Sequence, residues 1–404
     1  MKKYLGIKVA GIILAGSTAL PVIAGATESL EKEVERLTTR LNVLENKSTS
    51  KIPSLKTTLK VSGYIQADIV HHTNADNGAF FDAGLTPKIP ESANTELQAN
   101  QSRLNISTTS YVNGKPFLAA FEFDGITAEG NEVFSNSIGV RFRHAYIKYD
   151  KYLIGQFWSN FQDSVAVPLL LDISSPAGRV FVRQTQFRYT TGQWAFSLEN
   201  SETQAIQGLT VSSESLGGVG KDTIPDIIAS WRGGNGGSDG SFQISGVLRT
   251  LGIDGTVNEV DYSDTHTGWG LNAAGNWKFG SVTLKANAAY GDGIGRYINN
   301  GWANDVRLNS DGTTDVITSL GYSAAIEKSW SSKYASTLSY GHFESLDDIG
   351  AFGTQELNTY RANLRYTFDS GTMLGGEIMF AEREWVDGDT GDNTRIQISV
   401  RHKF

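Results

Sequence analysis

The chain has 404 residues, with 35 basic and 43 acidic side chains and a net charge of −8. It contains no cysteine, which excludes a disulfide framework and thiol chemistry. We expect no nucleic-acid partner.

Residues 1–26 have the pattern of a secretory signal peptide. Lys2, Lys3 and Lys8 form a basic start, an apolar stretch follows, and the small residues 24–26 provide a cleavage site. The alternative is a membrane-anchor helix, but the apolar stretch is interrupted and shorter than the about 20 residues that a spanning helix needs. Removing the three lysines changes the net charge from −8 to −11.

Residues 27–47 are predicted to form one helix whose apolar positions are spaced 4, 3, 4 and 3 apart. Such spacing is typical of a coiled coil, but about two and a half heptads are marginal alone. Barrels that already associate would hold these helices at high effective concentration. The alternative is a lone amphipathic helix lying on the barrel or the membrane. Residues 48–57 are polar and are predicted to be a linker. The predicted oligomerisation positions are Leu30, Val34, Leu37, Leu41 and Leu44.

Residues 58–404 repeat one pattern, in which runs of alternating apolar and polar residues are separated by clusters of Gly, Asp, Asn and Ser. About sixteen such runs give roughly 22 residues per strand and connection, which suits a membrane barrel. The sequence therefore predicts an all-β fold, a transmembrane antiparallel barrel of about 16 strands. A mean hydropathy of −0.25 does not oppose this, since lipid-facing and lumen-facing residues cancel.

The last ten residues show the alternation most clearly, because they have one apolar and one basic or polar face. This pattern predicts the closing strand of a barrel, which places the chain in the outer membrane of a Gram-negative bacterium among lipid and lipopolysaccharide. We expect Phe404 to join the periplasmic aromatic girdle, and the strand to be read by the barrel-assembly machinery. The apolar positions are Ile396, Ile398, Val400 and Phe404, and the polar ones are Arg395, Gln397, Ser399, Arg401 and Lys403.

A secreted β-sandwich is the soluble alternative. Its inner faces would also alternate, but a packed core needs larger residues than the many Gly and Ala present here. Lipid tolerates these small residues on an apolar face, which favours the membrane barrel.

The predicted lumen-facing wall is biased towards positive charge, whereas acidic clusters fall in predicted loops. A positive ring at a narrow point selects for anions, and an arginine fork suits carboxylate or phosphate. The alternative is that inward arginines only pair with inward acids. The inward basic positions are Lys60, Arg103, Arg249, Arg361, Arg365, Arg395, Arg401 and Lys403.

Two strands are difficult to phase, and they flank an unusual loop. Around residues 140–149 the alternation breaks, and a bulge near His144 would repair it. In residues 181–189, Gln184 and Gln186 are predicted to face the lumen, and the face on which Arg183 lies is left open. Residues 159–178 between them are apolar for a loop. We expect this loop to fold into the lumen and narrow the pore, with a subunit contact as the alternative.

Five segments resemble the DcaP-like porin family, which belongs to a wider group that includes phosphate-selective porins. The resemblance implies a trimer of sixteen-stranded barrels, a periplasmic coiled coil and uptake of dicarboxylates or similar small anions. It also implies constriction arginines drawn from Arg103, Arg141, Arg143, Arg179 and Arg183. No strand carries a long, regular arginine ladder, which argues against tight phosphate selectivity. The segments are SGYIQADIVHH (62–72), RFRHAYIKY (141–149), LIGQFWSNFQD (153–163), PDIIASWR (225–232) and YGDGIGRYI (290–298).

No enzymatic chemistry is expected. The six histidines show no metal-ligand spacing and adjoin no plausible nucleophile, so we expect neither a metal nor a cofactor. The glycine-rich stretch 291–295 lacks the following helix of a nucleotide cradle. Two hypotheses remain: a passive channel for small anions, and an adhesive or structural barrel with incidental permeability.

Overall fold

The computed structural model describes residues 57–75, 78–126, 139–207, 220–234, 240–298, 303–347, 349 and 353–404, together with residues 32, 35, 36, 38 and 39. The chain divides into two compact units, Met1–Lys56 and Thr57–Phe404. In the first unit the five described residues are helical, and the Thr39 hydroxyl donates to the Glu35 carbonyl oxygen over 2.8 Å. The predicted signal peptide, the five heptad positions and the linker up to Lys56 lie outside the described residues.

In the second unit the described residues form a closed antiparallel barrel of sixteen strands, as predicted. Each strand pairs with the next, and β20 returns to β1 in a register from Tyr64–Lys403 to His72–Arg395. The strands are β1 (Thr58–His72), β3 (Arg103–Val112), β4 (Lys115–Asp124), β5 (Arg141–Tyr149), β6 (Tyr152–Trp158), β7 (Arg183–Thr191), β8 (Trp194–Glu199), β10 (Asp226–Gly234), β11 (Gly240–Val257), β12 (Val260–Phe279), β13 (Val282–Asp292), β16 (Thr318–Ser329), β17 (Tyr334–Ser345), β18 (Thr354–Thr367), β19 (Thr372–Trp385) and β20 (Thr390–Lys403).

Shorter elements lie in the connections. β2 (Asn94–Gln98) pairs with β1 beyond the end of β3. β9 (Ala205–Gln207), β14 (Val306–Leu308) and β15 (Thr314–Val316) form a separate three-stranded sheet. The 3₁₀ helices are η1 (Ala83–Leu85), η2 (Ser164–Ala166) and η3 (Gly295–Tyr297). Among the described residues, no helix has the length and apolar character needed to cross a bilayer.

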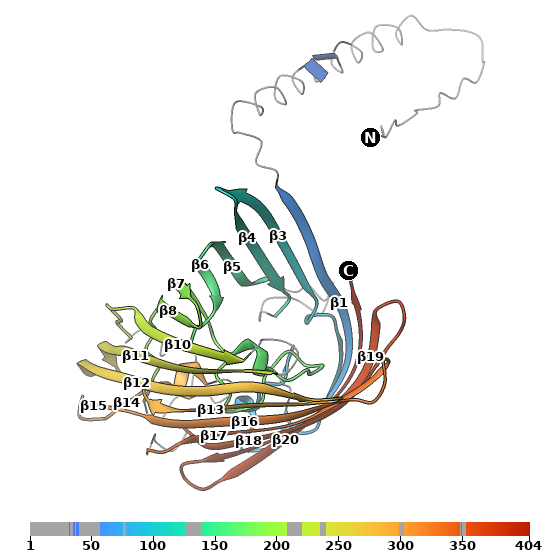
Figure 1. The fold of residues 1–404 in the computed structure, drawn as a ribbon. Helices are drawn as coiled ribbons and strands as arrows, with labels where there is room; N and C mark the ends of the chain where they lie inside the picture. Colours follow the sequence, from blue (N-terminus) through green and yellow to red (C-terminus); the bar gives the residue numbers. More distant parts are fainter. Residues whose placement is uncertain are drawn as a thin grey trace, which may run out of the picture. The chain divides into compact units, whose positions relative to one another are not determined.

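The two ends of the barrel differ in their connections (Figure 1). We call one end of the barrel the turn end, because it carries tight turns together with the start of β1 and the end of β20. At the β3–β4 turn, Asn113 and Gly114 both have positive φ, 51° and 76°, as type I′ hairpins require. The opposite, loop end carries the long connections, including residues 73–102 and 159–182.

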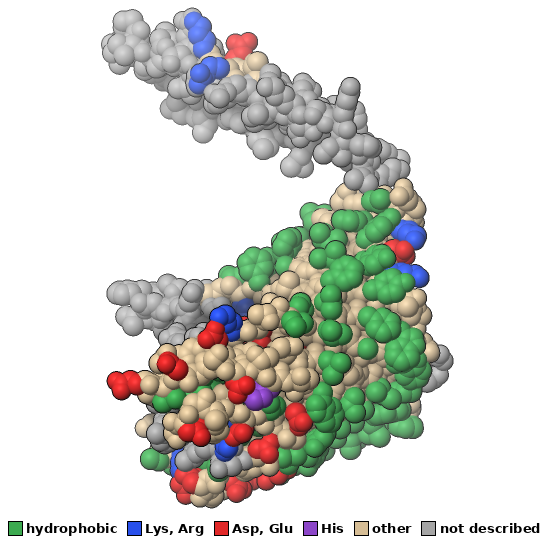
Figure 2. Space-filling model, turned by 90° about the vertical axis from the view of Figure 1, so that its left-hand side faces the viewer, with side chains coloured by type: hydrophobic (Ala, Val, Ile, Leu, Met, Phe, Trp, Pro, Cys, Tyr) green, Lys and Arg blue, Asp and Glu red, His purple; other side chains and the backbone are tan. Residues whose placement is uncertain are grey.

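The closing strand has the two faces that its sequence predicts. Ile396, Ile398 and Val400 are 45–50% exposed on the outer wall, whereas Arg395 and Ser399 are fully buried inside. Hydrophobic side chains cover the outer wall in a broad band (Figure 2). Such a surface is stable only against an apolar surrounding, which lipid supplies.

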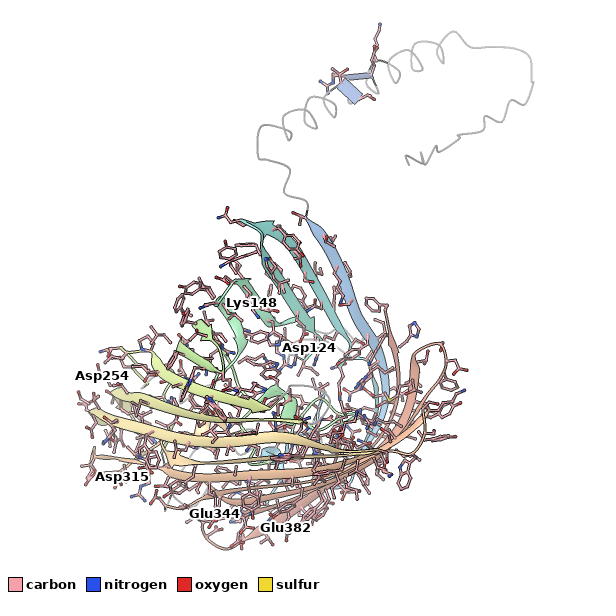
Figure 3. All side chains as sticks on the ribbon, viewed as in Figure 1. Asp124, Lys148, Asp254, Asp315, Glu344 and Glu382 are labelled. Atoms are coloured by element: carbon pink, nitrogen blue, oxygen red, sulfur yellow. The ribbon has the colours of Figure 1, made fainter. Side chains whose placement is uncertain are left out.

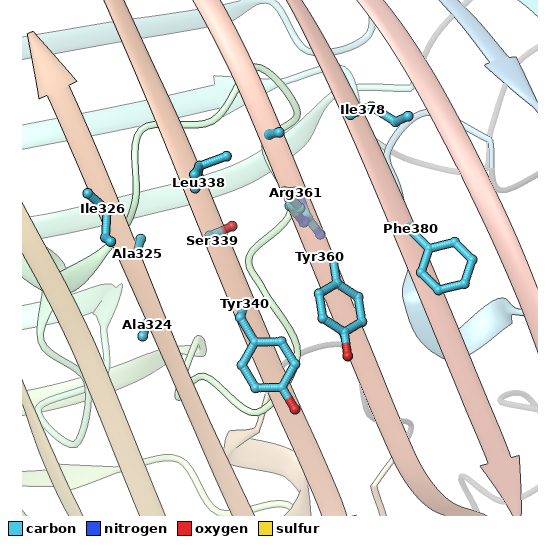
Figure 4. Close-up of a pocket in the computed structure, with 11 residues that line it drawn as sticks. Ala324, Ala325, Ile326, Leu338, Ser339, Tyr340, Tyr360, Arg361, Ile378 and Phe380 are labelled. Atoms are coloured by element: carbon cyan, nitrogen blue, oxygen red, sulfur yellow. The ribbon is translucent and has the colours of Figure 1, made fainter.

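The outer wall also has a shallow groove of about 490 Å³ between β16 and β19 (Figure 4). Ile326, Leu338, Tyr360 and Phe380 line it, whereas the Arg361 side chain points behind the sheet. Neighbouring strand positions thus separate apolar outer side chains from a polar lumen.

The predicted bulge near His144 is confirmed. The β4–β5 register pairs Glu122 with His144 and then Phe123 with Phe142, so Arg143 is the extra residue. Two consecutive side chains, Arg143 and His144, are therefore buried. This local irregularity places an additional guanidinium in the lumen.

Candidate anion site in the channel lumen

The connection between β6 and β7, residues 159–182, folds into the lumen as predicted. Its backbone contacts inward-facing side chains on the distant wall: Lys285 donates to the Val167 carbonyl oxygen over 2.7 Å, and Glu377 accepts from the Leu171 amide over 2.8 Å. Gln66 and Arg401 both donate to the Leu171 carbonyl oxygen. We call residues 159–182 the constriction loop.

The hydrogen bonds of the constriction loop are distributed unevenly around the barrel. They reach β8, β10 to β13, β16, β18 to β20 and β1. In the described part of the chain, the loop makes none to β3–β7 or β17, although close backbone contacts reach β17. The loop therefore covers most of the wall and leaves β3–β7 to border the remaining passage.

Asp172 anchors the middle of the constriction loop. It lies 3.8 Å from Arg361 and 3.5 Å from Arg395, and its carboxylate accepts from the Phe81 amide over 3.1 Å. Burial alone would raise the pKa of Asp172, but the charges of Arg395 and Arg361 and hydrogen bonds from Ser174 hold it below 3.8. The carboxylate is thus kept ionised as the counter-charge of two buried arginines.

Glycines allow the constriction loop to approach the wall backbone to backbone. Gly178 has φ +71°, and a Cβ there would lie 1.6 Å from the His342 carbonyl oxygen. On the wall, a Cβ on Gly321 or Gly341 would lie 2.4 Å from a loop carbonyl oxygen. These contacts fix how far the loop stands from β16 and β17.

The uncovered strands carry a cluster of arginines with two carboxylates. Arg141 binds Asp124 through two nitrogens, each at 2.9 Å. Arg143 bridges Glu122 at 2.7 Å and Asp124 at 2.9 Å, and Arg103 lies 3.7 Å from Glu122. Asp124 lies midway between the barrel ends (Figure 3).

Aromatic rings support the same cluster. The Arg183 guanidinium lies 4.5 Å from the Trp158 ring centroid, and that of Arg143 lies 5.7 Å from it. Tyr64 lies between two guanidiniums, Arg401 at 4.6 Å and Arg103 at 5.6 Å. Aromatic faces attract cations, so these rings hold the arginines without neutralising them.

The cluster has an excess of positive charge. Four guanidiniums (Arg103, Arg141, Arg143 and Arg183) face two carboxylates. Arg103 Nε and Arg183 Nη1 are buried donors without a hydrogen-bond partner among the described residues. Arg103 Nε faces Glu122 Oε1 at 3.7 Å, which is too long for a hydrogen bond, and the Arg103 side chain stays 22% exposed, so its guanidinium can reach an anion in the passage.

The other predicted site arginines lie elsewhere. Arg179 donates to the Asp163 carbonyl oxygen over 2.7 Å, and burial lowers its pKa to about 9. Arg249 is enclosed by Asp226 at 3.2 Å and Asp305 at 2.9 Å. Arg361 holds the constriction loop, and Arg365 donates to the Thr337 hydroxyl over 3.1 Å. Inward orientation therefore does not by itself place an arginine beside the passage.

Sequence reasoning missed the roles of Trp158 and Tyr64, although both stand in the segments that carry the family resemblance. Tyr64 meets Arg401 because β20 closes the barrel against β1, and Trp158 meets Arg183 across the neighbouring strands β6 and β7. Among the described residues, no group of three or more His, Asp or Glu side chains could hold a metal ion.

A closed barrel with an apolar outer wall, a loop folded into the lumen and charged side chains at the narrowing is the architecture of a transmembrane β-barrel with a constricted lumen. No protein-family model matches the sequence, and no curated protein is similar to it. Solved structures do share the fold. The outer membrane channel DcaP of Acinetobacter baumannii aligns with a TM-score of 0.75 at 19% identity, covering 86% of this chain and 97% of that chain.

Two further solved structures are similar at lower levels. An anion-selective porin from Comamonas acidovorans gives a TM-score of 0.57 at 10% identity, covering 86% of this chain and 100% of that chain. Salmonella typhi OmpF, in complex with daunomycin, gives 0.54 at 11% identity, covering 86% and 97%. The resemblance to DcaP-like porins is thus confirmed at the level of the fold.

Proposed function

We propose that the protein is an outer-membrane porin, a passive diffusion channel for small anionic solutes, above all dicarboxylates. The observation that carries this proposal is the coincidence of two features. The constriction loop makes no hydrogen bond to β3–β7 among the described residues, and the arginine cluster lies on β3, β5 and β7 with an excess of two positive charges. A positive narrowing raises the local concentration of anions and repels cations.

The arrangement of the cluster favours a solute with two carboxylates. Arg141 and Arg143 already bind Asp124 and Glu122, which orients their forks. Arg103 and Arg183, on either side, retain the unpartnered donors. A dicarboxylate can offer one carboxylate to each, whereas a monocarboxylate satisfies only one at a time.

A homotrimer is part of the proposal. The heptads of residues 27–47 would join neighbouring barrels in the periplasm, as in the family that the sequence resembles. The DcaP channel and the Comamonas porin share the barrel fold, and the latter is described as anion-selective.

Conductance in planar bilayers tests the function. Under a potassium chloride gradient, we expect the sign of the reversal potential to show anion preference and succinate to reduce the current. Replacing both Arg103 and Arg183 by Gln should lower the anion preference and weaken succinate block by about tenfold, because each lost charge-assisted hydrogen bond contributes about 1.5–3 kcal/mol in isolation and less across a wet pore.

Arg307→Gln is the matched control, since this arginine pairs with Asp315 at the loop end and lies outside the cluster. It should leave selectivity unchanged. Cation preference would refute the anion proposal, and absence of open conductance would favour the adhesive or structural alternative.

A further inference from the structure

A ring of lysines lines the lumen at the turn end, apart from the arginine cluster. Lys60 shares its strand face with buried Gln66, and Lys403 shares its face with buried Ser399. Lys278 lies on the same face of β12 as buried Asn272. Lys148 lies on the same face of β5 as buried His144, and Figure 3 shows it at the turn end. All four side chains are exposed, and no ion pair is found for any of them among the described residues.

A second tier of cations lies between this ring and the constriction loop. These side chains come from β7, β10, β13, β18 and β20. Several hold the loop from the turn side: Arg232 lies 2.8 Å from Asp163, Lys285 donates to the Val167 carbonyl oxygen over 2.7 Å, and Arg401 donates to the Leu171 carbonyl oxygen over 3.0 Å. The members of this tier are Arg188, Arg232, Lys285, Arg365 and Arg401.

The loop end has the opposite charge. Acidic side chains gather there on the face shown in Figure 2. Asp254, Asp315, Glu344 and Glu382 mark this end in Figure 3, far from Lys148. Fixed charge thus changes sign along the axis of the barrel, from acidic at the loop end to basic at the turn end.

We infer that the lumen on the turn side of the constriction is a second anion compartment, which retains multivalent anions and makes conduction asymmetric. This inference rests on the proposed channel function. When the loop side is electrically positive, anions enter from the basic end while cations enter from the acidic end, so both carriers accumulate inside. The reverse voltage depletes both carriers. The compartment recognises charge density rather than shape, since its lysines are spread around the ring.

Current–voltage curves of the full-length protein test this inference. The chain has no cysteine, so a single Asp311→Cys substitution at the exposed loop end, labelled from one chamber, reports orientation. At about 0.01 M salt, where the Debye length is about 30 Å, we expect current with the loop side positive to exceed the reverse by about twofold or more. At about 1 M salt the asymmetry should vanish.

Pyrophosphate is the probe for the compartment. Added on the turn side, it should block at about tenfold lower concentration than on the loop side, because the ring raises its local concentration. Replacing Lys60, Lys148, Lys278 and Lys403 by Gln should remove both the asymmetry and the side dependence. The matched control replaces Lys115 and Lys328, which lie at the same end but share strand faces with outward Phe121 and Ile326.

The outcomes separate this inference from the channel proposal. Anion preference with symmetric current and equal block from both sides would overturn the second compartment and leave the porin intact. Equal effects of the inner and outer lysine substitutions would also overturn it. Absence of conductance would refute the channel itself.

Discussion

Asp172 of the constriction loop faces Arg395 of the closing strand, with 3.5 Å between Oδ2 and Nη2. Both side chains are fully buried, and Arg361 approaches the same carboxylate from β18. The two residues are 223 positions apart in the chain (395 − 172), so this contact links the narrowing to the strand that closes the barrel.

Replacing Asp172 by Asn should release the constriction loop. The change leaves Arg361 and Arg395 buried without their counter-charge, which typically costs about 3–5 kcal/mol. We expect a lower melting temperature and larger, noisier single-channel conductance. Asp315→Asn breaks an exposed pair instead and should change stability by no more than about 1 kcal/mol. An unchanged conductance in the Asp172 variant would contradict the anchoring role.

The Asp172 carboxylate should make the mobility of the constriction loop depend on pH. The pKa of Asp172 in the folded protein lies below the ordinary value of 3.8. The carboxylate therefore stabilises the loop fully at a pH above 3.8, and this stabilisation is lost as the pH falls through the folded pKa. Loop fluctuations should therefore increase only below about pH 4. Conductance noise recorded between pH 6 and pH 3 measures this, and the Asn variant should show no such step.

A side chain at Gly341 should displace the constriction loop. A Cβ there would lie 2.4 Å from the Ala177 carbonyl oxygen, and overpacking of this kind costs about 1–3 kcal/mol. We expect Gly341→Val to increase pore conductance and weaken anion preference. Gly376→Ala is the control, because nothing lies within 4 Å of its added Cβ. Identical behaviour of the two variants would show that the glycine contact does not set the pore width.

Arg249 should matter for stability and not for selectivity. Its guanidinium is enclosed by Asp226 and Asp305, away from the cluster on β3 to β7. Arg249→Met should reduce the free energy of unfolding by about 3–5 kcal/mol, since two buried carboxylates lose their partner. Heat-modifiability on gels measures the first effect and reversal potential the second. A shift in reversal potential would place Arg249 in the conduction path.

Deleting residues 28–47 should leave a folded barrel and weaken the trimer, because the heptads add association only through effective concentration. Gel migration of unheated samples, compared with the full chain, measures this. An equally heat-resistant trimer would remove the predicted role of Leu30 and the other heptad positions.

Local alternation made much of the barrel predictable. The faces of the closing strand follow from side chains pointing alternately to lipid and lumen, and the bulge at His144 follows from one break in that alternation. The inward course of residues 159–178 was predictable because an exposed apolar loop is unfavourable. Arg183 could not be phased, since it begins β7 directly after the loop.

Alternation along the chain was enough to predict a barrel of about sixteen strands with a basic inner face, because side chains change face at every residue of a strand. Which arginines border the passage depended on the folded arrangement of strands and loop. Arg103, Arg143 and Arg183 meet through strand pairing and a bulge, whereas Arg249 and Arg361 are taken up by carboxylates and loop carbonyls. That division depends on where one loop lies against the wall, and its contacts join residues as distant as Asp172 and Arg395.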